Sequence, residues 1–152
     1  MAPVGDLEIR SLSTADLSAL SFDQHVSENS QRWRHLTDLV SSGRGQLLVA
    51  ERGAEAPVVG YLGLAWSHFF DRDFVDLLVV APEARRAGVG SELLRAAVDV
   101  ATTATVFTST NESNSPMRAL LTRDGWLVSG TLDGLDPGDP EVVYYLPPSH
   151  AF

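Results

Sequence analysis

The stretch Phe74-Val-Asp-Leu-Leu-Val-Val-Ala-Pro-Glu-Ala-Arg-Arg-Ala-Gly-Val-Gly-Ser-Glu-Leu-Leu94 decides the fold of this 152-residue chain. Residues 74–80 are apolar except for Asp76, which is typical of a buried strand. Pro82 ends that strand because proline has no N–H to donate. Gly88 and Gly90 then open an amphipathic helix over residues 88–101.

The turn between this strand and this helix suits a phosphate group. The first N–H groups of a helix are unpaired and lie at the positive end of its dipole. Glycine lets a phosphate approach the backbone closely, and Arg85 and Arg86 add cationic donors. A dinucleotide-binding fold would need a third glycine where Leu93 stands, and a purely structural turn would not need the two arginines. The sequence therefore predicts a site for a phosphorylated cofactor.

The segments on either side of this stretch predict one mixed α/β domain over residues 1–152. Further strands are expected at 6–10, 46–51, 58–66, 105–109, 126–131 and 141–146, from period-two or continuous apolar patterns. Helices are expected after Ser13 or Thr14, over 30–40, and between a Ser115 cap and Gly125. Residues 67–72 are expected to form a loop. The strand, helix, strand order around the glycine turn predicts a parallel crossover.

Composition and charge exclude several classes of function. The chain has no cysteine and, since all eleven cations are arginine, no lysine; disulfides, thiolate catalysis and lysine Schiff-base chemistry are excluded. The net charge of −9 disfavours nucleic acid as a partner. The histidines, His35 and His150 among them, have no metal-ligand spacing, so no metal is expected. No secretory or membrane-spanning run is evident, and a cytoplasmic protein without a membrane partner is expected.

Two motifs now identify a resemblance. Arg85-Arg-Ala-Gly88-Val-Gly90 is similar to the Q/R-x-x-G-x-G/A motif of the GNAT superfamily of acyl-CoA-dependent N-acetyltransferases. Asn114, Met117 and Leu120, followed by Gly125-Trp126, resemble the second signature of that family. The predicted order of strands and helices agrees as well, so the resemblance covers nearly the whole chain.

The resemblance implies a mixed, mostly antiparallel sheet flanked by helices, whose central strands splay apart at a bulge. It implies acetyl-CoA as co-substrate and transfer of its acetyl group to a primary amine of a small molecule or peptide, by direct attack on the thioester. Pantetheine would bond to the backbone before the motif, the pyrophosphate would bind the turn, and the amide of the second signature would contact pantetheine. The cofactor-binding residues that it implies are Leu78, Val79, Val80, Arg85, Arg86, Ala87, Gly88, Val89, Gly90, Ser91 and Asn114. Asn114 has a second interpretation, as a residue that only caps the following helix.

An alkylammonium must lose a proton before it can attack a thioester, so the chemistry needs a base. Asp76 is the candidate, because it is the one charged group in an apolar strand; by alternation it shares a face with Leu78 and Val80 unless a bulge intervenes. A structural aspartate is the alternative interpretation. His68, Asp71 and Asp73 are rival bases in or next to the preceding loop.

The protonation of the leaving thiolate is where the chain departs from the family. Many members have a tyrosine just after the leucine of the second signature, whereas this chain has Leu121. Tyr144 is the candidate acid, and Ser113, Ser115, Tyr145 or water are alternatives. The departure keeps open a second class of function, an acyl-CoA-binding module without catalysis.

The amine-binding residues are expected in the two least regular parts of the chain, around the joint of the first two helices and in the loop at 67–72. These parts contain Phe22, His25, Trp33, His68, Phe69 and Phe70. For the aromatic residues of the first group, a place in the core is the alternative interpretation. A homodimer through the late strands is a further option that the sequence leaves open.

Overall fold

The computed structural model describes residues 7–27, 30–53 and 57–148. In chain order the elements, where η marks a 3₁₀ helix, are β1 (Glu8–Ser11), η2 (Thr14–Leu20), α1 (Gln31–Ser41), β2 (Gly45–Glu51), β3 (Val58–Phe69), β4 (Arg72–Val80), η3 (Pro82–Ala84), α2 (Val89–Val100), β5 (Val106–Asn111), α3 (Ser115–Arg123), β6 (Leu127–Leu132) and β7 (Glu141–Leu146). Within these ranges no helix is both long and apolar enough to cross a membrane.

All seven described strands belong to one sheet, in the order β1-β2-β3-β4-β5-β7-β6. Neighbouring strands are antiparallel except β4 and β5, which run parallel and are joined through α2. The predicted mixed α/β fold, mostly antiparallel and with one parallel crossover, is confirmed.

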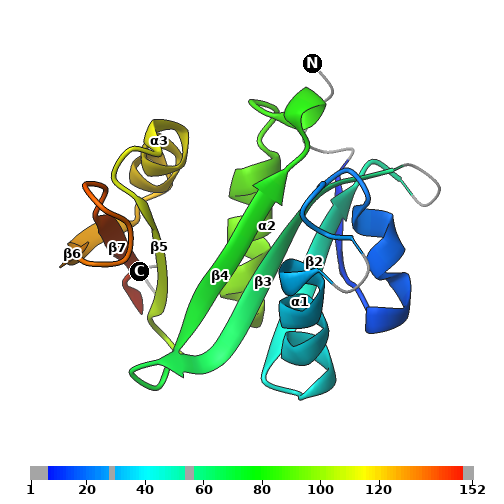
Figure 1. Ribbon diagram of the computed structural model, residues 1–152, viewed down its shortest axis with the longest axis horizontal. Coiled ribbons are helices and arrows are strands. Elements are labelled where there is room, and N and C mark those ends of the chain that lie inside the picture. The colour runs from blue at the N-terminus through cyan, green and yellow to red at the C-terminus, as the bar shows by residue number, and fades with distance from the viewer. Residues whose placement is uncertain (1–6, 28–29, 54–56, 149–152) are drawn as a thin grey trace.

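The two faces of the sheet are covered by different helices (Figure 1). On one face η2 and α1 pack over β2 and β3, where Leu36 lies among buried residues such as Val49 and Tyr61. On the other face α2 packs Leu93 and Leu94 against Leu62 and other residues of the sheet. The apolar stripe of each helix is buried against the sheet, and this burial holds α1 and α2 on opposite faces of the sheet.

The centre of the sheet is split. β4 and β5 pair from Asp73 with Val106 to Val75 with Thr108, and there the pairing ends. The Thr108 hydroxyl donates to the Val75 carbonyl at 2.9 Å at this point. Beyond it β4 continues to Val80, paired with β3, while β5 diverges (Figure 1). One edge of β4 is therefore open over its second half.

Two local predictions were wrong. β3 runs on to Phe69 and β4 begins at Arg72, so the expected loop is a hairpin in which Phe70 and Asp71, with φ of 49° and 61°, form the two-residue turn. Ser67 and His68, whose polar side chains suggested a loop, are exposed residues of β3. The helix after Asn111 is capped by Asn114, whose side chain accepts from the Met117 N–H, and Ser115 is its first residue. The short helix expected after Ser13 or Thr14 is present as a 3₁₀ helix.

Candidate functional site

The turn between β4 and α2 presents unpaired backbone donors. Gly88 has φ of 84° and caps α2, and the first α-helical bond is that of the Glu92 N–H to the Gly88 carbonyl, at 3.1 Å. The N–H groups of Val89, Gly90 and Ser91 precede it and have no acceptor within the helix. Arg86 also adopts a left-handed conformation, with φ of 66°. The backbone before α2 and its first turn therefore present a group of N–H donors that is suited to bind an anion.

Gly90 has a packing role beside its place in the turn. A Cβ built at Gly90 would lie 3.1 Å from Leu120 Cδ2 of α3, closer than side chains normally approach. Glycine at this position therefore lets α3 lie against the first turn of α2. The second signature of the sequence is brought next to the first by this contact.

Three arginines surround the turn, of which the sequence indicated two. Arg86 is exposed, and Arg85 Nε donates to the Val80 carbonyl at 3.4 Å. Arg123, at the end of α3, donates to Ser91 Oγ in the first turn of α2 at 3.2 Å. Arg123 lies 32 residues from Ser91 in the chain, so no local pattern could have associated the two.

The open edge of β4 leads directly into this turn. The Ala81 N–H donates to the Val59 carbonyl of β3 at 2.8 Å. Because the backbone groups of successive strand residues point to alternate sides, the N–H groups of Val80 and Leu78 point away from β3. They lie beyond the end of the β4–β5 pairing. Leu78 and Val80, though not Val79, can therefore offer backbone hydrogen bonds to an extended ligand on this edge.

Asp76 lies at a β-bulge where the two central strands part. Gly63 pairs with Leu77 and Leu64 with Val75, so Asp76 is the extra residue of β4. Leu78 and Val80 pack on the α2 side of the sheet and Leu77 on the α1 side. The Asp76 carboxylate contacts His35 of α1. Simple alternation, which would place Asp76 with Leu78 and Val80, does not apply, because a bulge intervenes and turns its side chain to the opposite face.

The bulge borders a pocket of about 510 Å³ on the α1 side of the sheet. A carboxylate and an imidazole contact each other in this pocket: Asp76 Oδ2 lies 2.5 Å from His35 Nε2. The sequence did not indicate His35 as a site residue, because its partner is 41 residues away. The remaining lining residues come from the joint before α1, from its first turn and from β4, and they are His25, Ser30, Gln31, Arg32 and Leu77.

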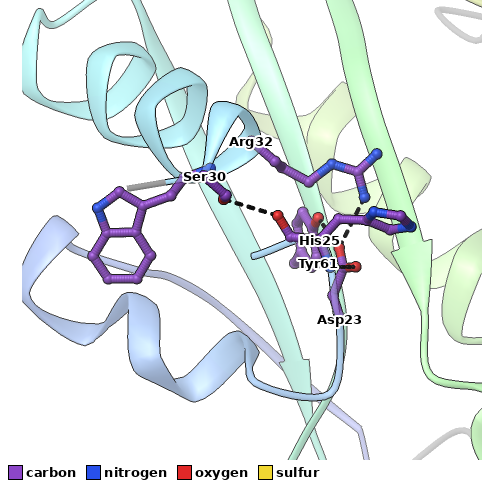
Figure 2. A network of polar contacts seen from close by, with 6 residues as sticks. Asp23, His25, Ser30, Arg32 and Tyr61 are labelled. Carbon is purple, nitrogen blue, oxygen red and sulfur yellow. Dashed lines mark hydrogen bonds and ion pairs between the residues drawn. The ribbon is translucent and has the colours of Figure 1, made fainter. Parts of the chain in front are cut away.

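A buried aspartate fixes the wall of this pocket (Figure 2). Asp23 accepts hydrogen bonds from Tyr61 Oη at 2.5 Å, from Arg32 Nη1 at 3.0 Å and from the His25 N–H at 2.9 Å. Ser30 adds a bond from its hydroxyl to the His25 carbonyl and caps α1 by accepting from the Trp33 N–H. The joint before α1 is thereby tied to β3 and to the first turn of α1.

These contacts shift two pKa values. Burial alone would raise the pKa of Asp23, but the hydrogen bonds from Tyr61, the His25 N–H and Arg32, together with the charge of Arg32, lower it below its ordinary value. The pKa of Tyr61 is raised well above its ordinary value by burial, and further by its bond to the Asp23 carboxylate. Asp23 is therefore a charged acceptor and Tyr61 a neutral donor at neutral pH.

The six residues expected to bind the amine do not come together. His25 lines the α1-side pocket. Phe22 and Trp33 are half-buried and pack in the core on that side, Phe22 with its ring 6.1 Å from that of Tyr61. His68, Phe69 and Phe70 belong to the β3–β4 hairpin, at the opposite end of β4 from the glycine turn. Phe69 and Phe70 line a second hollow, of about 560 Å³, with residues of β5, β6 and β7.

The other candidate bases, His68, Asp71 and Asp73, lie in the β3–β4 hairpin. Asp73 is fully buried, and its carboxylate accepts from the Ser67 N–H at 2.9 Å and from the Thr102 N–H and hydroxyl at 2.5 and 2.8 Å. This carboxylate ties the hairpin to the loop after α2, which is a structural role. Asp71 is an exposed turn residue and His68 an exposed strand residue, and neither lines the pocket at Asp76.

The region of α3 contains the remaining candidates. Asn114 caps α3 and also donates from Nδ2 to Thr110 Oγ1 at 3.0 Å. Leu121 is fully buried in the core. Tyr144 of β7 is buried too, and its hydroxyl oxygen accepts from Arg118 Nε at 3.2 Å, so its own proton is free to be donated. Arg118 is a partner of this hydroxyl that the sequence did not indicate.

Comparisons with known proteins agree with the architecture and the two motifs. The model of the acetyltransferase (GNAT) family matches residues 8–126. A GNAT-family acetyltransferase from Bacillus cereus ATCC 10987 is similar with a TM-score of 0.80 and 30% identity, over 93% of this chain and 96% of that one. No curated protein sequence matches the chain.

Two solved structures of lower identity share the fold. The ribosomal-protein-S18-alanine N-acetyltransferase from Escherichia coli has a TM-score of 0.71 and 19% identity, over 93% of each chain. The spermidine N-acetyltransferase SpeG chimera from Vibrio cholerae and hSSAT has a TM-score of 0.73 and 18% identity, over 95% of this chain and 97% of that one. Because the family model matches most of the length of the chain, the chain belongs to the GNAT family of acetyltransferases.

Proposed function

We propose that the protein is an acetyl-CoA-dependent N-acetyltransferase that acetylates a primary amine of a small molecule or peptide. The observation that carries the proposal is the open edge of β4, which parts from β5 after Val75 and ends in a turn of unpaired N–H groups. An extended arm that ends in a pyrophosphate fits such a continuous surface, because the edge offers strand-like hydrogen bonds and the turn offers an anion site.

Different residues of β4, the turn and α3 would bind different parts of acetyl-CoA. Leu78 and Val80 would bond to pantetheine through their backbone, and the N–H groups of 86–91 would bind the pyrophosphate. Arg85, Arg86 and Arg123 would supply positive charge around the turn, since all three lie beside it. Asn114 is proposed to reach pantetheine from α3 through its amide. The bound cofactor supplies the thioester whose carbonyl carbon the amine attacks, and a backbone N–H near Val80 is the proposed donor to its oxygen.

The amine would enter from the α1-side pocket. Asp76 lies in that pocket, at the point where β4 and β5 part, and the ammonium is proposed to lose its proton in this part of the pocket. His25 is proposed to contact the amine there. Solved structures of the same fold carry the names of enzymes for a protein N-terminal alanine and for spermidine, which supports both peptide and small-molecule amines as candidates.

One observation favours a second candidate function, an acyl-CoA-binding module of the same fold without catalysis. Leu121, at the position where many relatives have a tyrosine, is buried and cannot donate a proton. For the enzyme, Tyr144 is the proposed acid, because its hydroxyl proton is not used in the contact with Arg118. A single domain, a cytoplasmic location and a homodimer through the late strands stay predictions.

The experiment measures two quantities on the same protein. Acetyl-CoA should raise the Tm, by an amount that grows with its concentration. Release of the CoA thiol should then be followed with a panel of amines that includes spermidine and a peptide with N-terminal alanine; the absence of cysteine removes any background thiol from the protein. A Tm shift with thiol release supports the enzyme, and a Tm shift without release from any amine supports the binding module. No Tm shift would contradict both candidates.

A further inference from the structure

The contact between His35 of α1 and Asp76 of β4 joins a second titratable group to the pocket. His35 Nε2 lies 2.5 Å from Asp76 Oδ2, and both residues line the α1-side pocket. The two side chains are exposed unequally: 48% of the His35 side chain is accessible against 22% of Asp76. An incoming amine therefore meets the imidazole more readily than the carboxylate.

The contact also decides which ring nitrogen is available. A carboxylate only accepts hydrogen bonds, so the neutral imidazole carries its hydrogen on Nε2 and donates it to Asp76. Nδ1 then holds the lone pair and can accept a proton. Imidazole is a stronger base than a carboxylate, and the neighbouring Asp76 compensates the charge of the imidazolium once it forms.

We propose that His35 Nδ1, and not Asp76, accepts the proton of the amine substrate, and that Asp76 is a positioning residue for the His35 ring. The inference rests on the proposed acetyltransferase function and names the proton acceptor of that reaction. The bulge in β4 is what makes the pair: without it the carboxylate of Asp76 would point to the α2 side, away from α1.

The proton and electron balance of the reaction is complete with this pair. The ammonium gives one proton to His35 Nδ1, which passes it to solvent. The free amine attacks the thioester carbon, forming the C–N bond and breaking the C–S bond. The departing sulfur takes a proton from Tyr144, the proposed acid, and the second proton of the nitrogen replaces it, so the products are an amide, CoA thiol and one proton in solution.

Other charged groups near the pair are already compensated or lie outside the pocket. Arg32 is bound to Asp23, with Nη1 3.0 Å from Oδ2. Asp38, one turn along α1 from His35, is exposed and paired with Arg44 at 3.1 Å. His25 is the other titratable group that lines the pocket, and it provides a matched control.

The test compares the pH dependence of kcat/KM in wild type, His35→Gln, Asp76→Asn and His25→Gln, with an amine that the wild-type protein acetylates. His35→Gln should lower kcat/KM by about a hundredfold or more near neutral pH, and it should remove the acid limb that a histidine base produces. Asp76→Asn should lower kcat by about tenfold or more with little change in KM, while the acid limb remains because the base is intact. His25→Gln should also retain the limb, although KM changes.

The outcomes separate the base from its partner. Retention of the acid limb in His35→Gln, or its loss in Asp76→Asn alone, would overturn the inference while leaving the acetyltransferase function standing. Absence of turnover by wild type with every amine would overturn both. The Tm shift with acetyl-CoA, measured on each variant, shows that the fold and the cofactor site are retained, so that a kinetic loss is assigned to the pair.

Discussion

The glycine turn and the α1-side pocket are adjacent along β4 but are built in different ways. The turn is contiguous: residues 85–91 supply its backbone donors, its two left-handed residues and two of its arginines. The pocket combines the joint before α1, the first turn of α1 and a bulge in β4. A local site depends on backbone conformation, whereas an assembled one depends on long-range contacts. Mutations should therefore damage the turn through ligand binding and the buried wall of the pocket through stability.

The largest effect is expected from Gly88→Glu in the turn. The new residue must adopt φ of 84° and places a carboxylate where a phosphate would lie, so acetyl-CoA binding should weaken at least about a thousandfold, or about 4 kcal/mol. Titration calorimetry measures the loss. Gly43→Glu is the matched control, because Gly43 also has a positive φ, of 71°, next to the end of a helix and has no atoms near its Cβ position. Equal weakening in both variants would show that backbone strain, and not the turn, is responsible.

The second prediction concerns the wall of the pocket. Asp23→Ala removes the acceptor of Tyr61 and Arg32 and should lower the free energy of unfolding by about 3 kcal/mol, measured in urea. Asp38→Ala removes an exposed aspartate that is also paired with an arginine and should cost less than about 0.5 kcal/mol. If the two variants were equally stable, the buried network would not be what holds the pocket together. Gly88→Glu should leave Asp23 and its partners intact.

The same network predicts a dependence of stability on pH. Because the pKa of Tyr61 is raised in the folded state, the unfolded chain loses this proton first as the pH rises through about 10. Unfolding free energy should then fall by up to about 1.4 kcal/mol per pH unit in wild type relative to Tyr61→Phe, which has no such group. Asp23 has the opposite sign: its lowered pKa gives stability that is present at neutral pH and lost in acid. Parallel alkaline curves for wild type and Tyr61→Phe would contradict the assignment.

The difference between the two regions also explains how far the sequence could be interpreted. The turn, the strand before it and the two signatures were predictable because their information is local: Pro82 ends the strand, and Gly88 provides the positive φ. The resemblance implied a bulge between the central strands, but its position at Asp76 was not predictable, because a bulge is set by the register of β4 against β3. His35 was missed for a related reason, since its partner lies on another element.

The β3–β4 hairpin shows the same limit in another form. Ser67, His68 and Asp71 gave a loop-like pattern, yet β3 continues through the first two because its end is an exposed hairpin tip. Phe69 and Phe70 were expected to bind the amine together with His25, because both stretches belong to the least regular parts of the chain. In the fold they line a separate hollow against β5, β6 and β7. The sequence could not show that these two parts of the chain lie apart, because their distance depends on contacts in three dimensions.

The smallest effect is expected at Asn114, which belongs to both kinds of site. Its side-chain oxygen accepts from the Met117 N–H and its amide nitrogen donates to Thr110 Oγ1. Asn114→Ala should lower the free energy of unfolding by about 1 kcal/mol through loss of the cap, whereas Asn114→Asp keeps an acceptor for the Met117 N–H and should be nearly as stable as wild type. Asn114→Asp nevertheless lacks the amide donor. If it retains stability but binds acetyl-CoA more weakly, Asn114 contacts the cofactor; if it retains both, Asn114 is a cap alone, and the cofactor-binding surface ends at the turn and the open edge of β4.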